Sequence, residues 1–118
     1  RVAIARAMTF QPRILLYDEP TTGLDPITSI TIDDEIVKLR DIEGVSSLVV
    51  THQLRDAFWV AERMAVRGPD GKVQIVPASP EKLAQTEFVM LRDGLIAFEG
   101  TASELRATND PYLQLFLS

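Results

Sequence analysis

Apolar and polar residues follow two different periods along this 118-residue chain. Segments 13–17 and 46–50 contain the apolar runs Ile14–Tyr17 and Leu48–Val50, which are typical of strands buried in a parallel sheet. Apolar residues recur at helical spacing in 26–39 and 54–61, and an alanine-rich segment at 1–9 also predicts a helix. This alternation predicts the α/β fold class, with helices flanking a parallel sheet.

The second half of the chain predicts hairpins and short helices. Strands are expected at 63–66 and 72–76, a loop with a helical turn at 77–85, and a hairpin at 88–98. The following Thr-Ala-Ser-Glu has the spacing of a capping box that opens a helix, and a final apolar helix is expected from Pro111 onward. That last helix either packs against the sheet or docks a partner.

Two adjacent acids, Asp18 and Glu19, follow the first apolar run. Open α/β sheets place their ligands at the carboxyl ends of such strands. Asp18 suits a magnesium ion held through water, and Glu19 suits the orientation or deprotonation of an attacking water. Adjacent acids do not fit a glycosidase, whose two carboxyl groups stand several ångströms apart across the substrate. The residues alone leave open a solvated turn beside Pro20.

A single histidine, His52, follows the second apolar run, so it is expected at the same edge as the acid pair. A histidine there can hydrogen-bond a phosphate oxygen and the attacking water, but its spacing fits a surface loop residue as well. Asp25 stands directly before Pro26 and predicts a helix cap, with Gly23 allowing a tight turn in the preceding loop.

Three strings in this order resemble the C-terminal half of an ABC-type ATPase domain. Residues 14–19, ILLYDE, resemble the Walker B strand with its catalytic glutamate. Residues 21–26, TTGLDP, resemble the D-loop, and 47–53, SLVVTHQ, resemble the strand that ends in the switch histidine. As one continuous string, Asp-Glu-Pro-Thr-x-Gly-Leu-Asp is a specific signal.

The resemblance implies roles for five residues. Glu19 and His52 would be catalytic, and Asp18 would hold Mg²⁺, through water. Gly23 and Asp25 would contribute to the cofactor site, with Asp25 communicating across a head-to-tail dimer with a second ATPase subunit. The cofactors implied are ATP and Mg²⁺.

The phosphate-loop pattern G-x-x-x-x-G-K-[ST] does not occur in the chain. We therefore expect residues 1–118 to be the C-terminal part of one ABC ATPase domain, a P-loop NTPase-like partial fold without the Walker A half. Segment 67–87 interrupts the family's usual pattern and is expected to be a surface insertion. The fragment alone is expected to be inactive, and a truncated, non-catalytic interaction fragment is an alternative.

The composition limits the cellular locations and the partners that fit this protein. The chain is 46% apolar, contains no cysteine and carries a net charge of −5. No apolar run approaches the length that spans a bilayer, and no signal peptide is visible. The lack of a basic cluster argues against a nucleic-acid partner. We expect a cytoplasmic protein, peripheral on the inner face of the bacterial cell membrane.

Within the ABC group, the run 22–29 and the late apolar helix are most similar to the Mla-type ATPases of lipid handling and organic-solvent tolerance. That similarity implies an ATPase subunit that couples ATP hydrolysis to transport of phospholipid or another hydrophobic substrate. Its partners would be transmembrane permease subunits and a periplasmic, substrate-binding lipid-transfer subunit. A soluble ABC-type ATPase outside transport is the alternative.

Overall fold

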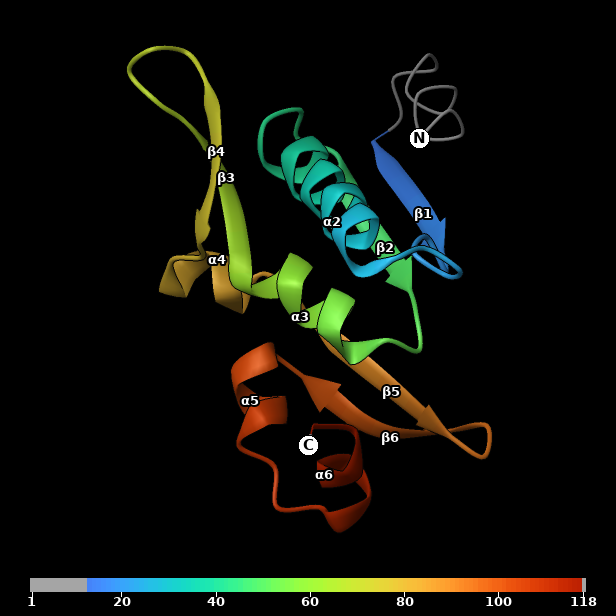
Figure 1. Cartoon of the computed structure of the whole chain (residues 1–118). Helices are drawn as coiled ribbons and strands as arrows, with labels where there is room; N and C mark the ends of the chain where they lie inside the picture. Colours follow the sequence, from blue (N-terminus) through green and yellow to red (C-terminus); the bar gives the residue numbers. More distant parts are fainter. Residues whose placement is uncertain (1–12, 118) are drawn as a thin grey trace.

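A computed structural model describes residues 13–117 of the chain (Figure 1), so the helix expected at 1–9 lies outside the described residues. Helices and strands alternate through the first half of the described part, which confirms the α/β fold class. The elements in chain order are β1 (Ile14–Asp18), α2 (Pro26–Asp41), β2 (Ser46–Val50), α3 (Leu54–Glu62), β3 (Arg63–Arg67), β4 (Val73–Pro77), α4 (Pro80–Ala84), β5 (Phe88–Arg92), β6 (Leu95–Gly100), α5 (Ala102–Arg106) and α6 (Pro111–Leu117).

The parallel pair β1 and β2 is joined by the long helix α2, which lies across them (Figure 1). Parallel strands need such a crossover, because their ends are too far apart for a tight turn. The buried side chains of β1, Leu15 and Tyr17, pack in one apolar cluster with Ile36 and Val37 of α2. Both α2 residues are fully buried, so this face of the sheet is the centre of the core.

The other face of the same two strands is exposed in the described part of the chain. Ile14 is 68% exposed, Leu16 64% and Leu48 60%. Successive side chains of a strand point to opposite faces, and α2 covers only one of them. The strands predicted to be buried in a parallel sheet are therefore covered on one face only within residues 13–117.

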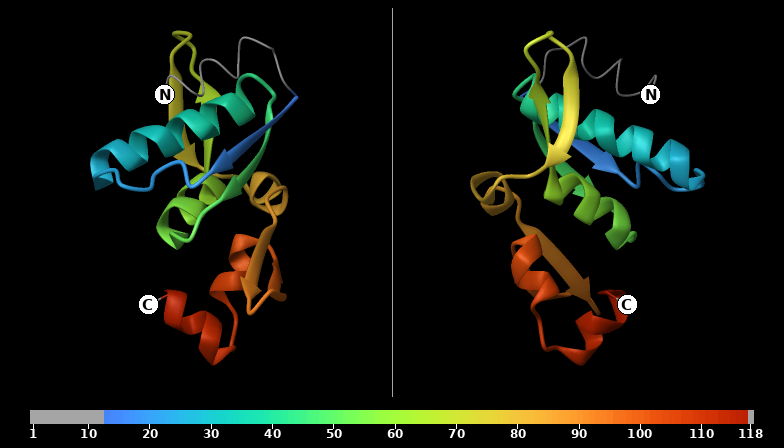
Figure 2. Two further views of the ribbon diagram at one scale, coloured as in Figure 1. Left: turned by 90° about the vertical axis from the view of Figure 1, so that its right-hand side faces the viewer. Right: turned by 60° about the vertical axis from the view of Figure 1, so that its left-hand side comes forward.

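The antiparallel hairpin of β3 and β4 extends the first core. Val73 and Ile75 of β4 pack against the cluster that α2 and β1 form, and Ala65 of β3 is part of it. The hairpin accordingly stands beside α2 in both views of Figure 2. Part of segment 67–87, which we expected to be a surface excursion, therefore contributes side chains to the core.

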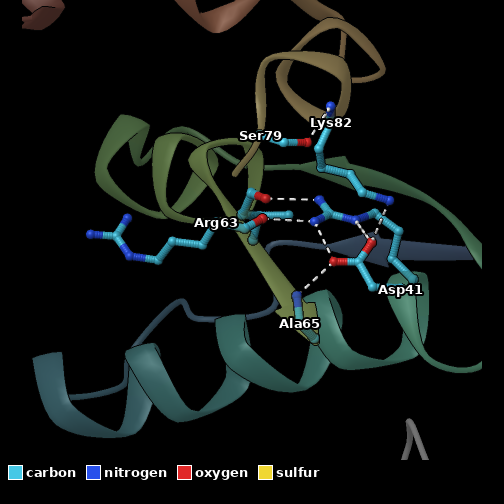
Figure 3. A network of polar contacts seen from close by, with 7 residues as sticks. Asp41, Arg63, Ala65, Ser79 and Lys82 are labelled. Carbon is cyan, nitrogen blue, oxygen red and sulfur yellow. Dashed lines mark hydrogen bonds and ion pairs between the residues drawn. The ribbon is translucent and has the colours of Figure 1, made fainter. Parts of the chain in front are cut away.

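A polar cluster around Asp41 fastens the end of α2 to β3 and α4 (Figure 3). Its carboxylate accepts hydrogen bonds from Arg40 Nε at 2.7 Å and from the backbone N–H of Ala65 at 2.8 Å. Lys82 Nζ of α4 lies 3.0 Å away, and Arg40 also donates to the carbonyl of Arg63. Burial alone would raise the pKa of Asp41, but these partners outweigh burial and lower the pKa.

A second apolar cluster holds the C-terminal elements, which lie at the end of the molecule away from α2 and β1 (Figure 2). Helix α3 joins the two clusters, because Val60 belongs to the first and Phe58 to the second. The predicted capping box is confirmed, since the Thr101 hydroxyl accepts from the Glu104 N–H and the Glu104 side chain accepts from the Thr101 N–H. Leu113 is buried here, as packing of the last helix requires.

Predicted boundaries differ from the observed ones by one or two residues. The strand expected at 13–17 lies at Ile14–Asp18, and the one expected at 72–76 lies at Val73–Pro77. The helix expected to end at Leu39 continues to Asp41, where the cluster described above anchors its last turn. Tertiary contacts of this kind determine where a helix ends when the local sequence does not.

Candidate functional site at the carboxyl edge of the parallel strands

The carboxyl ends of β1 and β2 bring the predicted acid pair and histidine to one edge of the sheet. Asp18 is the last residue of β1 and lies opposite Val50, the last residue of β2. The Glu19 N–H donates to the Val50 carbonyl at 2.7 Å, which prolongs the pairing by one residue. His52 then follows only two residues after β2.

Glu19 and His52 are in direct contact. Glu19 Oε2 lies 3.0 Å from His52 Nδ1, and the same oxygen accepts from Thr22 Oγ1 at 3.0 Å. The hydrogen bond with His52 is the largest effect on the pKa of Glu19, and it lowers that pKa despite some loss of hydration. The carboxylate is therefore kept ionised, as a group that accepts a proton or orients water must be.

The backbone of Glu19 has φ +50, in the left-handed region that residues with a side chain rarely occupy. This conformation reverses the chain direction immediately after β1 and turns the Glu19 side chain toward Thr22 and His52. A strained residue persists only where its surroundings hold it, and such residues gather at functional sites. Here the backbone bond to Val50 and the contacts of the carboxylate hold it.

The loop between β1 and α2 contains the other two predicted residues. Gly23 has φ +80, so the tight turn expected there is present. Asp25 caps α2, since its carboxylate accepts from the Thr28 N–H at 2.8 Å and from Thr28 Oγ1 at 3.0 Å. The backbone hydrogen bond from Thr28 is the main reason that the pKa of Asp25 is lowered. The predicted cap is confirmed, and its carboxylate is committed to Thr28 rather than to Glu19 or His52.

Asp18 is exposed and shares the open face of β1 with Ile14 and Leu16, four and two residues before it. Nothing in the described part of the chain forms an ion pair with it. Among residues 13–117, no three His, Cys, Asp or Glu side chains lie close enough together to hold a metal ion. A single free carboxylate does fit Mg²⁺, which keeps several waters and takes its remaining ligands from phosphate oxygens.

Sequence reasoning missed a set of buried polar residues beside this loop. Thr21, Asp33 and Asp56 are each at most 3% exposed, and Thr21 Oγ1 donates to Asp56 Oδ2 at 2.8 Å. One signal was available for Asp33, because it lies four residues from both Ser29 and Val37 on the buried face of α2. An acid within an apolar helical stripe marks a buried charge that needs a partner.

No helix within residues 13–117 is both long enough and apolar enough to cross a membrane.

The described fold is α/β, with an acid pair and a histidine at the carboxyl edge of its parallel strands. We compared the chain with known proteins to find its relatives. No family model matches the chain. It is 31% identical over 115 residues to the methionine import ATP-binding protein MetN 1 of Bacillus cereus, covering 93% of this chain and 33% of that protein. It is 43% identical over 65 residues to the phosphate import ATP-binding protein PstB of Shewanella denitrificans, covering 55% of this chain and 23% of that protein.

These relatives are ATP-binding proteins of ABC transporters, which confirms the predicted relationship to that group. The chain spans about a quarter to a third of the length of the curated relatives it matches. Their names concern the import of methionine and of phosphate, so they give no support to the Mla-type subgroup. A solved structure from work on the ATP-driven dimerization and DNA-stimulated activation of SMC ATPases aligns with a TM-score of 0.42 at 21% identity, over 67% of this chain and 48% of that chain.

Proposed function

We propose that the protein to which this chain belongs is the ATP-binding and ATP-hydrolysing subunit of an ABC transporter. The contact of Glu19 with His52, beside the exposed Asp18, is the observation that carries this proposal. It joins a proton acceptor, a group that can bind phosphate and a free carboxylate at the edge where α/β sheets bind ligands. The relationship to ATP-binding proteins of ABC transporters supports the same conclusion.

In this proposal each residue has a separate task. Glu19 takes or orients the proton of the attacking water, for which its lowered pKa keeps it ionised. His52 would bind a γ-phosphate oxygen, and its exposed side chain is already in contact with Glu19 through Nδ1. Asp18 would hold Mg²⁺ through water, and the ion would neutralise charge that develops on the phosphate.

The same proposal includes a second ATPase subunit and membrane partners. In a head-to-tail dimer, Gly23 and Asp25 of one subunit would lie near the nucleotide of the other, as the resemblance of their loop to a D-loop implies. The left-handed Gly23 and the capped helix behind it give this loop a defined shape. Binding to transmembrane permease subunits would place the protein in the cytoplasm, on the inner face of the membrane.

We further propose phospholipid or another hydrophobic molecule as the transported substrate. The similarity of the run 22–29 and of the late apolar helix to Mla-type ATPases supports this, and a periplasmic lipid-transfer subunit as a partner rests on the same similarity. Purification of the native complex in detergent, followed by mass spectrometry of its subunits and bound lipids, tests both. Recovery without any membrane subunit would favour a soluble ABC-type ATPase instead.

The substitution Glu19→Gln in the full-length protein tests the catalytic role. An amide cannot accept the proton from water, so we expect turnover to fall by about a hundredfold or more while ATP binding is retained. Phosphate release and fluorescent-nucleotide binding measure the two quantities. Glu43→Gln, a change at an exposed acid just beyond α2, is the matched control and should leave both unchanged. Normal turnover of Glu19→Gln would exclude Glu19 as the base.

A further inference from the structure

Three buried polar side chains connect the loop after β1 with helices α2 and α3. Thr21 is 2% exposed, Asp33 2% and Asp56 3%, although each comes from a different element. Thr21 Oγ1 donates to Asp56 Oδ2 at 2.8 Å, and it lies 3.5 Å from Gln53 Oε1. The chain segments that bear Glu19 and His52 therefore meet at one hydroxyl group.

The two buried acids lie on neighbouring helices, Asp33 on α2 and Asp56 on α3. Asp56 Oδ1 and Asp33 Oδ2 are both buried without a hydrogen-bond partner in the described residues. Burial raises the pKa of Asp33 to about 8, and the carboxyl group of Asp56 is the next largest cause. One proton shared by the two groups would satisfy both oxygens, whereas two ionised carboxylates would repel each other at a buried site.

The neighbouring charged groups do not offset the repulsion between the two acids. Asp34, on the same helix, raises the pKa of Asp33 further, and Arg55 of α3 lowers it by a smaller amount. Asp34 is engaged with Trp59 Nε1 of α3 at 2.8 Å. From the loop after β1, the group that reaches the pair is the uncharged hydroxyl of Thr21.

The connections of Thr21 and Asp56 reach the candidate site through the backbone. The Thr21 carbonyl accepts from the Leu24 N–H at 3.1 Å, which closes the turn that follows Glu19. The Asp56 N–H donates to the Gln53 carbonyl at 3.1 Å, in the first turn of α3 directly after His52. Movement of Thr21 and Asp56 would therefore displace the loops that bear Glu19 and His52.

We propose that Thr21, Asp56 and Asp33 are positioning residues, whose buried polar side chains hold the loops of Glu19 and His52 in register. This inference rests on the proposed function of Glu19 and His52. Loss of the shared proton would leave the two acids ionised and would weaken this arrangement at its inner end. The contact of Glu19 with His52 then depends on a proton bound away from both of them.

The direction of the pH dependence follows from the raised pKa. Asp33 binds its proton more tightly in the folded protein than in the unfolded chain, so its contribution to stability is lost as pH rises through the interval from about 4 to about 8. Positioning is intact below that folded pKa and fails above it. Turnover should therefore fall on the alkaline side, with a midpoint near the pKa of Asp33.

The test is the pH profile of ATP turnover in the full-length protein, compared between the unmodified protein and Asp33→Asn. The asparagine amide can donate to Asp56 without a titrating proton. We expect the unmodified protein to lose about tenfold in kcat between about pH 7 and about pH 9, and Asp33→Asn to lose that limb of the profile. The control Glu43→Gln should keep it. An unchanged alkaline limb in Asp33→Asn would overturn the proposal.

A second comparison separates positioning from simple loss of folding. Thr21→Val keeps the shape of the side chain but removes the donor, so we expect kcat to fall about tenfold with little change in KM, and Thr21→Ser to restore it. NMR amide signals of Glu19, Leu24 and His52 should shift with the Asp33 titration. If those signals do not respond, the acid pair is only structural. If turnover is absent at every pH, the proposed function fails and the amide signals still decide the positioning role.

Discussion

At the scale of single residues, two positions with positive φ have different explanations: a hairpin turn at Asp93 and the candidate site at Glu19. Glu19 and Asp93 are both outside the usual region, with φ +50 and φ +52. Asp93 and Gly94 form the two-residue turn between β5 and β6, where positive φ at both positions matches the twist of a hairpin. Glu19 follows a parallel strand that needs no such turn. Its strain is explained by the contact with His52.

A comparison of Gly23 with Gly44 separates the role of the Gly23 loop in ATP turnover from its effect on stability. Gly23→Ala and Gly44→Ala should each cost about 1 kcal/mol of unfolding free energy, because both positions have positive φ and neither added methyl group would meet another atom. Chemical denaturation measures that cost. Only Gly23→Ala should also reduce ATP turnover of the full-length protein, because Gly23 lies in the loop proposed to serve the nucleotide. Equal turnover in the two variants would remove Gly23 from the site.

At the scale of elements, local sequence signals predicted the secondary structure but not the way the elements pack. The strand Ser46–Val50 and the capping box at Thr101 follow from apolar runs and cap spacing, which act within a few residues. The role of α4 does not, because Lys82 reaches Asp41 across 41 positions of sequence. The same limit hid the pairing of Asp33 with Asp56. Such contacts depend on the fold, and no local pattern encodes them.

The cluster around Asp41 predicts unequal losses of stability when its acid, Asp41, or its lysine, Lys82, is removed. Asp41→Ala would leave the largely buried Arg40 without its carboxylate, so we expect a loss of about 3 kcal/mol or more in unfolding free energy. Lys82→Met removes a more exposed ammonium group and should cost about 1 kcal/mol or less. Urea unfolding followed by circular dichroism compares them. Equal costs would mean that α4, and with it segment 67–87, contributes more to the fold than its packing indicates.

At the scale of the whole molecule, the described strands form three separate two-stranded sheets rather than one continuous sheet. The parallel pair of β1 and β2 therefore has an unpaired edge on each side, in addition to its uncovered face. Leu16 and Leu48 are direct partners in the register and both point to that face. Open strand edges next to an apolar face favour pairing with another chain.

The 118-residue chain by itself should therefore self-associate through β1 and β2. Light scattering during gel filtration should show dimers or larger species. The double change Leu16→Thr and Leu48→Thr should shift them toward monomer, because it removes two of the four large apolar side chains that β1 and β2 expose. Leu95→Thr is the matched control, since Leu95 is 73% exposed but lies on the separate β5–β6 hairpin. A monodisperse monomer of the unmodified chain would contradict the expectation, and a monomer produced only by Leu95→Thr would move the associating surface to the hairpin.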